Sequence, residues 1–155
     1  MPVSFFDTNV LVYLASGDAK KADLAELAIA KGGSISVQVL NELANVARRK
    51  MEMSWDEAHA FLNSLRDLLT VHPLDIETHE TGLRLAERHG LSIYDAMIAA
   101  SALQAGCDTL WSEDMQHGMV LDGGLRVVNP FRGSVAMRLM RKAGWRKRSQ
   151  RPAGL

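Results

Sequence analysis

A chain of 155 residues that is 47% hydrophobic, with 18 basic residues balancing 18 acidic ones, predicts one folded core and excludes an intrinsically disordered protein. Its apolar runs are shorter than the roughly 18 residues that span a membrane, and its first residues do not resemble a signal peptide. The single cysteine, Cys107, has no partner for a disulfide within the chain, so we expect a cytoplasmic protein without membrane contact.

In chain order, short apolar segments alternate with segments of helical periodicity. We predict a strand at residues 3–6, helices at 10–15 and 19–31, a strand at 34–36, helices at 37–49 and 54–69, a strand around residue 71, helices at 76–89 and 93–105, and strands at 109–112 and 125–128. This alternation predicts an α/β fold with a mostly parallel central sheet. Functional sites in such folds form beyond the carboxyl ends of the strands.

Charge is unevenly distributed between the body of the chain and its C-terminal end. Residues 1–122 hold all 18 acids and 9 basic residues, whereas residues 123–155 hold the other 9 basic residues and no acid. We therefore divide the chain into a domain at 1–132 and a basic C-terminal extension at 133–155, which begins with an amphipathic helix at 135–142. Its candidates for contact with nucleic acid are Arg138, Arg141, Lys142, Trp145, Arg146, Lys147 and Arg148. The alternative is that the extension binds the acidic body or a protein partner.

Four acidic residues are the candidates for a functional site. Asp7 and Asp114 each follow a predicted strand by no more than two residues, so both should reach the carboxyl edge of the sheet. Glu42 flanks the apolar stripe of the helix at 37–49, and Asp95 lies in the first turn of an otherwise apolar helix. Each acid also has a structural explanation when taken alone, because loop and first-turn aspartates cap helices or form turns, and a boundary glutamate can reach water.

Taken together, the four acids predict a site for a divalent cation. Carboxylates crowded into one crevice repel one another and raise one another's pKa unless a cation lies among them. Oxygen ligands suit hard ions such as Mg²⁺ or Mn²⁺, which lower the pKa of a water and neutralise an attacked phosphate. None of the five histidines shows ligand spacing, and His117, which follows Asp114, is the one nearest to the predicted site in sequence.

Four segments resemble, in order and spacing, the motifs of PIN domains. They are residues 5–11 (FFDTNVL), 37–42 (VQVLNE), 91–100 (LSIYDAMIAA) and 110–115 (LWSEDM), and the resemblance covers about residues 3–131. It implies a three-layer α/β/α sandwich and an endoribonuclease that hydrolyses RNA with metal-activated water. The catalytic, metal-binding residues carried over are Asp7, Glu42, Asp95 and Asp114, with Mg²⁺ or Mn²⁺ as cofactor. Thr8, Asn9 and Ser112 are carried over as supporting residues.

The small size within this family is similar to that of VapC-type toxins of type II toxin–antitoxin systems. That resemblance implies a small antitoxin partner and a homodimer or larger assembly. Two features depart from many relatives: no aromatic residue follows the fourth acid in Met115–Gly118, and the chain extends beyond residue 131. The alternatives are a PIN nuclease of RNA maturation, or a non-catalytic module that binds RNA or protein. A phosphotransferase resembling haloacid dehalogenases would need a second aspartate where this chain has Asn9.

Overall fold

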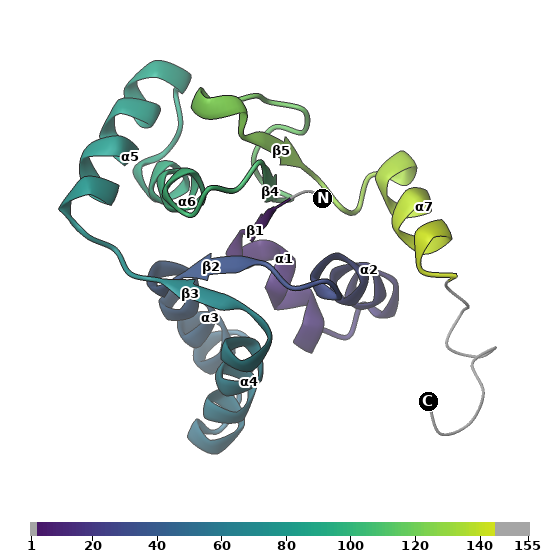
Figure 1. Ribbon diagram of the computed structural model, residues 1–155. Helices are drawn as coiled ribbons and strands as arrows, with labels where there is room; N and C mark the ends of the chain where they lie inside the picture. The colour runs from purple at the N-terminus through teal and green to yellow at the C-terminus, as the bar shows by residue number, and fades with distance from the viewer. Residues whose placement is uncertain (1–2, 145–155) are drawn as a thin grey trace.

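The computed structural model describes residues 3–144, which form a five-stranded sheet between two layers of helices (Figure 1). The strands are β1 (Ser4–Phe6), β2 (Ser34–Ser36), β3 (Thr70–His72), β4 (Thr109–Trp111) and β5 (Arg126–Val128). They are parallel to one another, in the order β3-β2-β1-β4-β5. The predicted α/β class and parallel sheet are therefore confirmed.

Helices cover both faces of the sheet. They are α1 (Thr8–Val12), the 3₁₀ turn η1 (Tyr13–Ala15), α2 (Ala19–Ile29), α3 (Val37–Arg49), α4 (Trp55–Leu68), α5 (Ile76–His89), α6 (Ile93–Gln104), the turn η2 (Asp122–Gly124) and α7 (Gly133–Lys142). Helices α5 and α6 lie on one face, and α1 to α4 with α7 lie on the other (Figure 1). This arrangement is the predicted three-layer α/β/α sandwich. In the described part of the chain, no helix has the length and apolar character needed to cross a membrane.

The strand order places a crevice between β1 and β4. From β1 the chain adds β2 and β3 on one side, and it then crosses over to add β4 and β5 on the other side. Connections that leave two neighbouring parallel strands in opposite directions open a crevice at the carboxyl ends of those strands. Residues Phe6 and Trp111 are paired at these ends, so the residues that follow them, Asp7 and Ser112, come directly after the carboxyl ends of the two strands.

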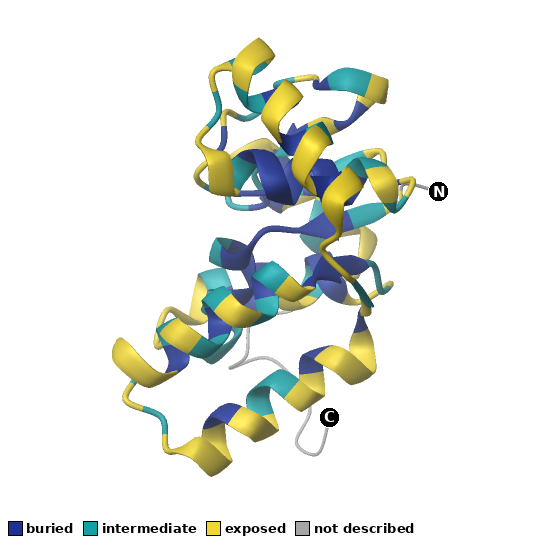
Figure 2. Cartoon of the chain, turned by 90° about the vertical axis from the view of Figure 1, so that its left-hand side faces the viewer, coloured by how far each residue is buried: buried dark blue, intermediate teal, exposed yellow. Residues whose placement is uncertain are grey.

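Helix α6 is the buried centre of its layer. Its residues from Ala96 to Ala102 are all buried, as expected for a helix that is apolar on every side, and Figure 2 shows the contrast with the exposed outer face of α5. The close approach of α5 to α6 depends on Gly82 of α5, because a Cβ atom at this position would lie 2.5 Å from the Sδ atom of Met97 in α6. Dense packing of α6 against α5, β2 and β4 thus fixes its first turn, which carries Asp95.

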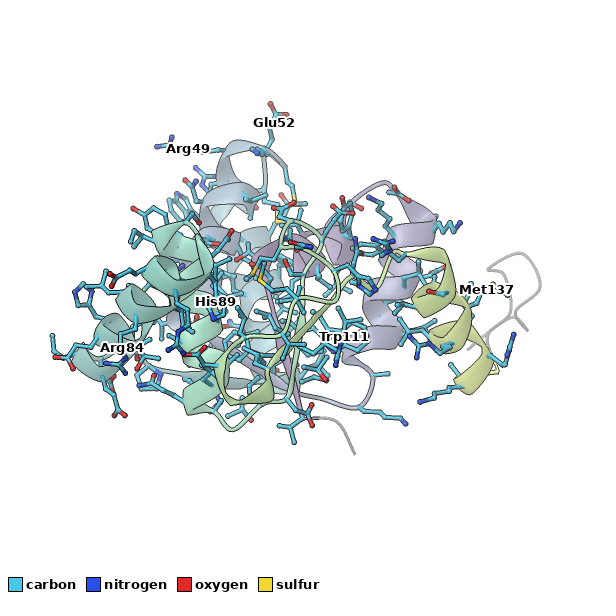
Figure 3. The ribbon with its side chains drawn as sticks, turned by 90° about the horizontal axis from the view of Figure 1, so that it is seen from above. Arg49, Glu52, Arg84, His89, Trp111 and Met137 are labelled. Carbon is cyan, nitrogen blue, oxygen red and sulfur yellow. The ribbon has the colours of Figure 1, made fainter. Side chains whose placement is uncertain are left out.

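The observed elements differ from the predicted ones at the ends of helices and strands. The first helix starts at Thr8 rather than at residue 10, because Asp7 accepts a hydrogen bond from the Thr8 amide as its N-cap. Helix α7 packs against α2 and buries Val135 and Ala136, while Met137 points away from the body (Figure 3). The division into residues 1–132 and 133–155 stays a prediction. The candidates Trp145, Arg146, Lys147 and Arg148 lie outside the described residues.

Candidate active site

Asp7 lies at the floor of the crevice and is held in one orientation by three hydrogen bonds. Its Oδ1 accepts from the backbone N–H of Thr8 at 2.7 Å. Its Oδ2 accepts from the Ser112 hydroxyl at 2.8 Å and from the Asn9 side-chain amide at 3.1 Å. Only 3% of Asp7 is exposed. The three supporting residues that we named from the sequence, Thr8, Asn9 and Ser112, therefore all donate a hydrogen bond to the Asp7 carboxylate.

The environment of Asp7 disfavours its charged form. Burial is the largest cause that raises the pKa of Asp7, and the charges of Asp95 and Glu42 also raise it, while hydrogen bonds from Ser112 and Thr8 lower it. The net result is a rise of the pKa from 3.8 to about 6. In the described chain none of the four acids forms an ion pair with a lysine, arginine or histidine. The cluster thus holds negative charge without a paired side-chain cation.

Glu42 is hydrogen-bonded to Thr8 and is linked, through Gln38, to the first turn of α6. Its Oε2 accepts from the Thr8 hydroxyl at 2.5 Å, and its Oε1 accepts from the Gln38 side-chain amide at 3.1 Å. The same amide of Gln38 donates to the backbone carbonyl of Tyr94 at 3.1 Å, directly before Asp95. From the sequence we assigned no role to Gln38. Its position four residues before Glu42 on the same helix could have indicated a hydrogen bond between the two side chains.

Asp95 and Asp114 complete the cluster on its outer side. Asp95 is half-buried in the first turn of α6, where its backbone N–H donates to the Ser92 hydroxyl at 3.2 Å, so Ser92 is the N-cap of the helix. Burial raises the pKa of Asp95, and the charges of Asp114 and Glu42 raise it as well, against a hydrogen bond with Ser92 that lowers it. Asp114 is exposed. The charge of Asp95 therefore interacts with all three of the other acids.

The donor set fits a hard divalent cation. Every donor side chain in the cluster is a carboxylate, and burial of Asp7 without a paired cation leaves negative charge to be compensated. Within residues 3–144, no three His, Cys, Asp or Glu side chains form a ready-made metal cage. Mg²⁺ commonly takes one or two direct carboxylates and keeps several waters, whereas zinc needs three or four protein ligands. The arrangement therefore suits magnesium or manganese better than zinc.

A second polar group lies beside the acidic cluster and was not predicted from the sequence. The Glu113 carboxylate accepts from the Tyr13 hydroxyl and from the Lys21 ammonium, each at 2.6 Å. Lys21 and Glu113 are 92 residues apart, and no local pattern connects them. His117 has a structural contact instead of a site contact, because its Nδ1 accepts from the backbone N–H of Asn129 at 3.0 Å.

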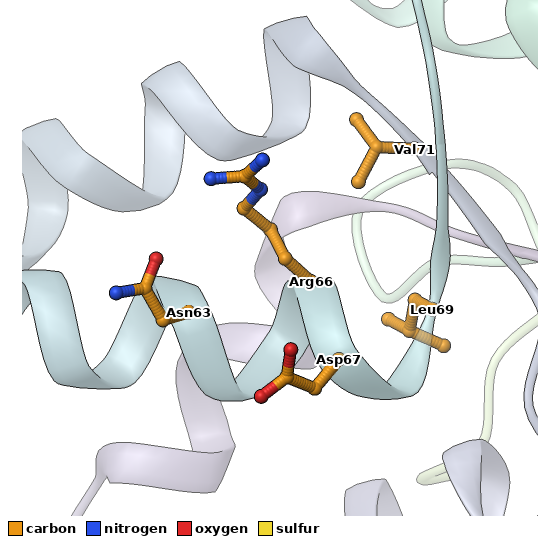
Figure 4. A pocket seen from close by; sticks show the side chains of 5 residues that line it. All are labelled: Asn63, Arg66, Asp67, Leu69 and Val71. Carbon is orange, nitrogen blue, oxygen red and sulfur yellow. The ribbon is translucent and has the colours of Figure 1, made fainter.

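The two described pockets lie apart from the acids. One, of about 430 Å³, is lined by residues of α4, by Val71 of β3 and by Leu69 between these elements, and Arg66 and Asp67 are among the α4 residues (Figure 4). The other, of about 590 Å³, lies between α2, α7 and the sheet and includes Arg138 and Lys142 in its lining. Neither pocket contains Asp7, Glu42, Asp95 or Asp114. The functional assignment therefore depends on the acidic cluster and not on a cavity.

Comparison with known proteins gives one family match and several similar structures. The family model described as PIN domain matches residues 4–118. No curated protein sequence matches the chain. A toxin–antitoxin complex from Klebsiella pneumoniae is 21% identical with a TM-score of 0.64, over 83% of this chain and 98% of that chain. The DNA-bound VapBC of Salmonella typhimurium is 19% identical with a TM-score of 0.62, over 84% and 99%.

A third similar structure is VapC20 of Mycobacterium tuberculosis, described as a toxin that cleaves the sarcin–ricin loop. It is 22% identical with a TM-score of 0.59, over 72% of this chain and 89% of that chain. At these identities the three similarities show a shared fold. The family match covers all four acids, the three supporting residues and the Glu113 group.

Proposed function

This chain belongs to the PIN-domain family, and we propose that it is a metal-dependent endoribonuclease that acts as the toxin of a toxin–antitoxin pair. The observation that carries the proposal is the buried Asp7 carboxylate, held by three donors beside three other acids and without a paired side-chain cation in the described chain. A structural acid of this kind would be a net cost to folding. Such a cost is typical of residues retained for function.

Asp7, Glu42, Asp95 and Asp114 are the residues that would hold Mg²⁺ or Mn²⁺. When bound, the ion supplies Lewis acidity, lowers the pKa of a water and offsets the charge of the attacked phosphate. The chain's own residues provide orientation. Thr8, Asn9 and Ser112 fix the carboxylates of Asp7 and Glu42 through the hydrogen bonds described above. The exposed Asp114 and half-buried Asp95 line the open side, from which an RNA phosphate would approach.

Similar structures support the toxin assignment. Those named above are described as a toxin–antitoxin complex, as VapBC bound to DNA, and as a toxin that cleaves the sarcin–ricin loop. By analogy of fold, we propose RNA as substrate, a small antitoxin as partner, assembly as a homodimer or larger complex, and a cytoplasmic location.

Incubation of the purified protein with a mixed RNA substrate tests the proposal. Cleavage should require Mg²⁺ or Mn²⁺, stop in EDTA, return on addition of the metal, and be abolished in Asp7→Asn. Hydrolysis by water leaves a 5′-phosphate and a 3′-hydroxyl, so end-labelling of the products is the second measurement. Cleavage that persists in EDTA, or a 2′,3′-cyclic phosphate product, would falsify the metal-dependent mechanism.

A further inference from the structure

The Glu113 carboxylate is engaged on both oxygens by residues outside the acidic cluster. Oε1 accepts from the Tyr13 hydroxyl and Oε2 accepts from Lys21 Nζ, both at 2.6 Å. Lys21 Nζ also donates to the Tyr13 hydroxyl at 3.0 Å, so the three side chains form a closed triangle. We call Tyr13, Lys21 and Glu113 the lysine triad. Glu113 directly precedes Asp114, yet its charge is paired, unlike those of the four acids.

Aromatic rings fix the ammonium group of Lys21 from two directions. Nζ lies 4.6 Å from the centroid of the Tyr13 ring and 5.1 Å from that of Phe131. The two rings contact each other edge to face, with centroids 4.9 Å apart. Side chains of lysine lose considerable entropy when they are held in one place, and exposed ion pairs usually contribute little. A lysine held by one carboxylate, one hydroxyl and two rings is therefore a specific feature of this surface.

The backbone of Glu113 connects the lysine triad to Asp7. Its N–H donates to Asn9 Oδ1 at 3.0 Å. The other atom of the same amide, Asn9 Nδ2, donates to Asp7 Oδ2 at 3.1 Å. Because Oδ1 of Asn9 must accept the Glu113 N–H, its Nδ2 must face Asp7, which fixes the orientation of the amide. The position of the 112–114 segment thus determines how Asn9 and Ser112 hold the Asp7 carboxylate.

We propose that Lys21 and Tyr13 are positioning residues of the acidic site, which act by anchoring Glu113 and thereby the segment that carries Ser112 and Asp114. The inference rests on the proposed function, because it assigns the triad a role in shaping the metal site. It also assigns Glu113 an anchoring role in place of a ligand role. A carboxylate with both oxygens occupied by a lysine and a tyrosine is held away from a cation in the neighbouring cluster.

Binding of Mn²⁺ to the purified protein without RNA tests the inference, with free Mn²⁺ measured by electron paramagnetic resonance. The variants are Lys21→Met, Glu113→Gln and the double variant, with Lys20→Met as the matched control on an exposed neighbour in α2. We expect each single variant to weaken Mn²⁺ binding by about tenfold, as for removal of residues that orient metal ligands. The double variant should be no weaker than either single one, because both residues act through the same anchor. Lys21→Arg, which keeps the cation, should restore most of the affinity.

The direction in which Lys21→Met changes the Mn²⁺ affinity shows whether Glu113 acts as an anchor or as a metal ligand. If Glu113 were a metal ligand, Glu113→Gln would weaken binding while Lys21→Met, by freeing the carboxylate, would leave binding unchanged or make it tighter. Either that pattern or wild-type affinity in both single variants, with circular dichroism showing folded proteins, overturns the inference. Wild-type protein that neither binds Mn²⁺ nor cuts RNA would instead overturn the proposed function, and the inference with it.

Discussion

The hydroxyl of Thr8 donates to Glu42 at 2.5 Å and connects the first turn of α1 to the middle of α3. Both residues are held by further contacts: Thr8 is 7% exposed and its backbone N–H donates to Asp7 Oδ1, and Glu42 Oε1 accepts from Gln38. One residue therefore orients two of the four acids, Asp7 through its backbone and Glu42 through its side chain. The buried Thr8, directly after the first acid, is thus more than a packing residue, because it orients carboxylates from two elements.

Replacement of Thr8 separates the hydroxyl from the shape of the side chain. Thr8→Val keeps the volume but leaves Glu42 Oε2 without this donor, so we expect cleavage to fall by about 10- to 100-fold, as for removal of residues that orient metal ligands. Thr8→Ser keeps the donor and should retain most of the activity. Cleavage rates on one RNA, with thermal unfolding as the check on folding, provide the measurement. Equal activity of the valine and serine variants would contradict the orienting role.

The pKa of Asp7 predicts a pH-dependent stability in the absence of metal. Because the folded protein has a pKa of about 6 where the unfolded chain has 3.8, the folded state binds more protons between these values. The free energy of unfolding therefore falls as pH rises from about 4 to about 6, by at most about 3 kcal/mol for this group. Its stabilising contribution is complete below pH 3.8 and is lost above pH 6.

Asp7→Asn tests this prediction because asparagine keeps the shape and removes the titration. Urea unfolding in EDTA should show the variant gaining stability relative to wild type as the pH is raised from 4.5 to 7.5. Addition of Mg²⁺ at pH 7.5 should stabilise the wild type and not the variant, because only the wild type has the ionised carboxylate at that position. A stability difference that is independent of pH would contradict the raised pKa.

Replacement of Asp95 tests whether this residue is a catalytic acid or only part of the N-terminal cap of α6. The cap of α6 is Ser92, whose hydroxyl accepts the Asp95 N–H, and that contact survives in Asp95→Asn. We therefore expect Asp95→Asn to stay folded while cleavage falls below detection, and its stability in EDTA to rise because one charge leaves the cluster. Cleavage assays and thermal unfolding are the two measurements. Near-normal cleavage by this variant would leave Asp95 with a structural role alone.

The sequence indicated where in the fold the four acids lie, but it did not indicate the contacts between the side chains around them. Local patterns located Asp7 and Asp114 beyond strands, and burial of the apolar helix α6 explains why Asp95 lies at the crevice. Packing over long sequence distances was not predictable in the same way. Lys21 and Glu113 meet only because α2 and the segment after β4 are folded onto the same region of the sheet, 92 residues apart in sequence. The Thr8–Glu42 contact likewise depends on how α1 packs against α3.

Toxicity in cells tests the proposed biological role. Expression of the chain alone should arrest bacterial growth, and expression of Asp7→Asn, which lacks the carboxylate at the floor of the cluster, should not. Co-expression with a small gene adjacent to its own should restore growth if that gene encodes the antitoxin. Colony counts after induction, with immunoblots to match expression, are the measurement. Harmless overexpression of a protein that cuts RNA in vitro would favour a role in RNA maturation.

The basic face of α7 is a candidate surface for contact with RNA. Arg138, Arg141 and Lys142 are exposed, while Val135 and Ala136 anchor the helix by burial. Deletion from residue 133 would therefore remove packing against α2 as well as charge. Substitution of glutamine for all three basic residues, which we call the α7 cations, changes only the charge.

If the α7 cations bind the RNA backbone, their replacement should weaken RNA binding at low salt and leave the metal requirement of cleavage unchanged. For single-stranded RNA, each phosphate that is no longer neutralised should reduce the slope of log affinity against log salt by about 0.7, so three such phosphates would reduce it by about 2. The matched control replaces Arg49, Lys50 and Arg66, which are also exposed and lie on α3, directly after α3 and on α4. This control should change the slope less. Fluorescence anisotropy with a catalytically inactive Asp7→Asn background measures binding without cleavage. An unchanged slope would exclude the RNA role of this face, and weaker antitoxin binding by the same variant would assign the face to the protein partner.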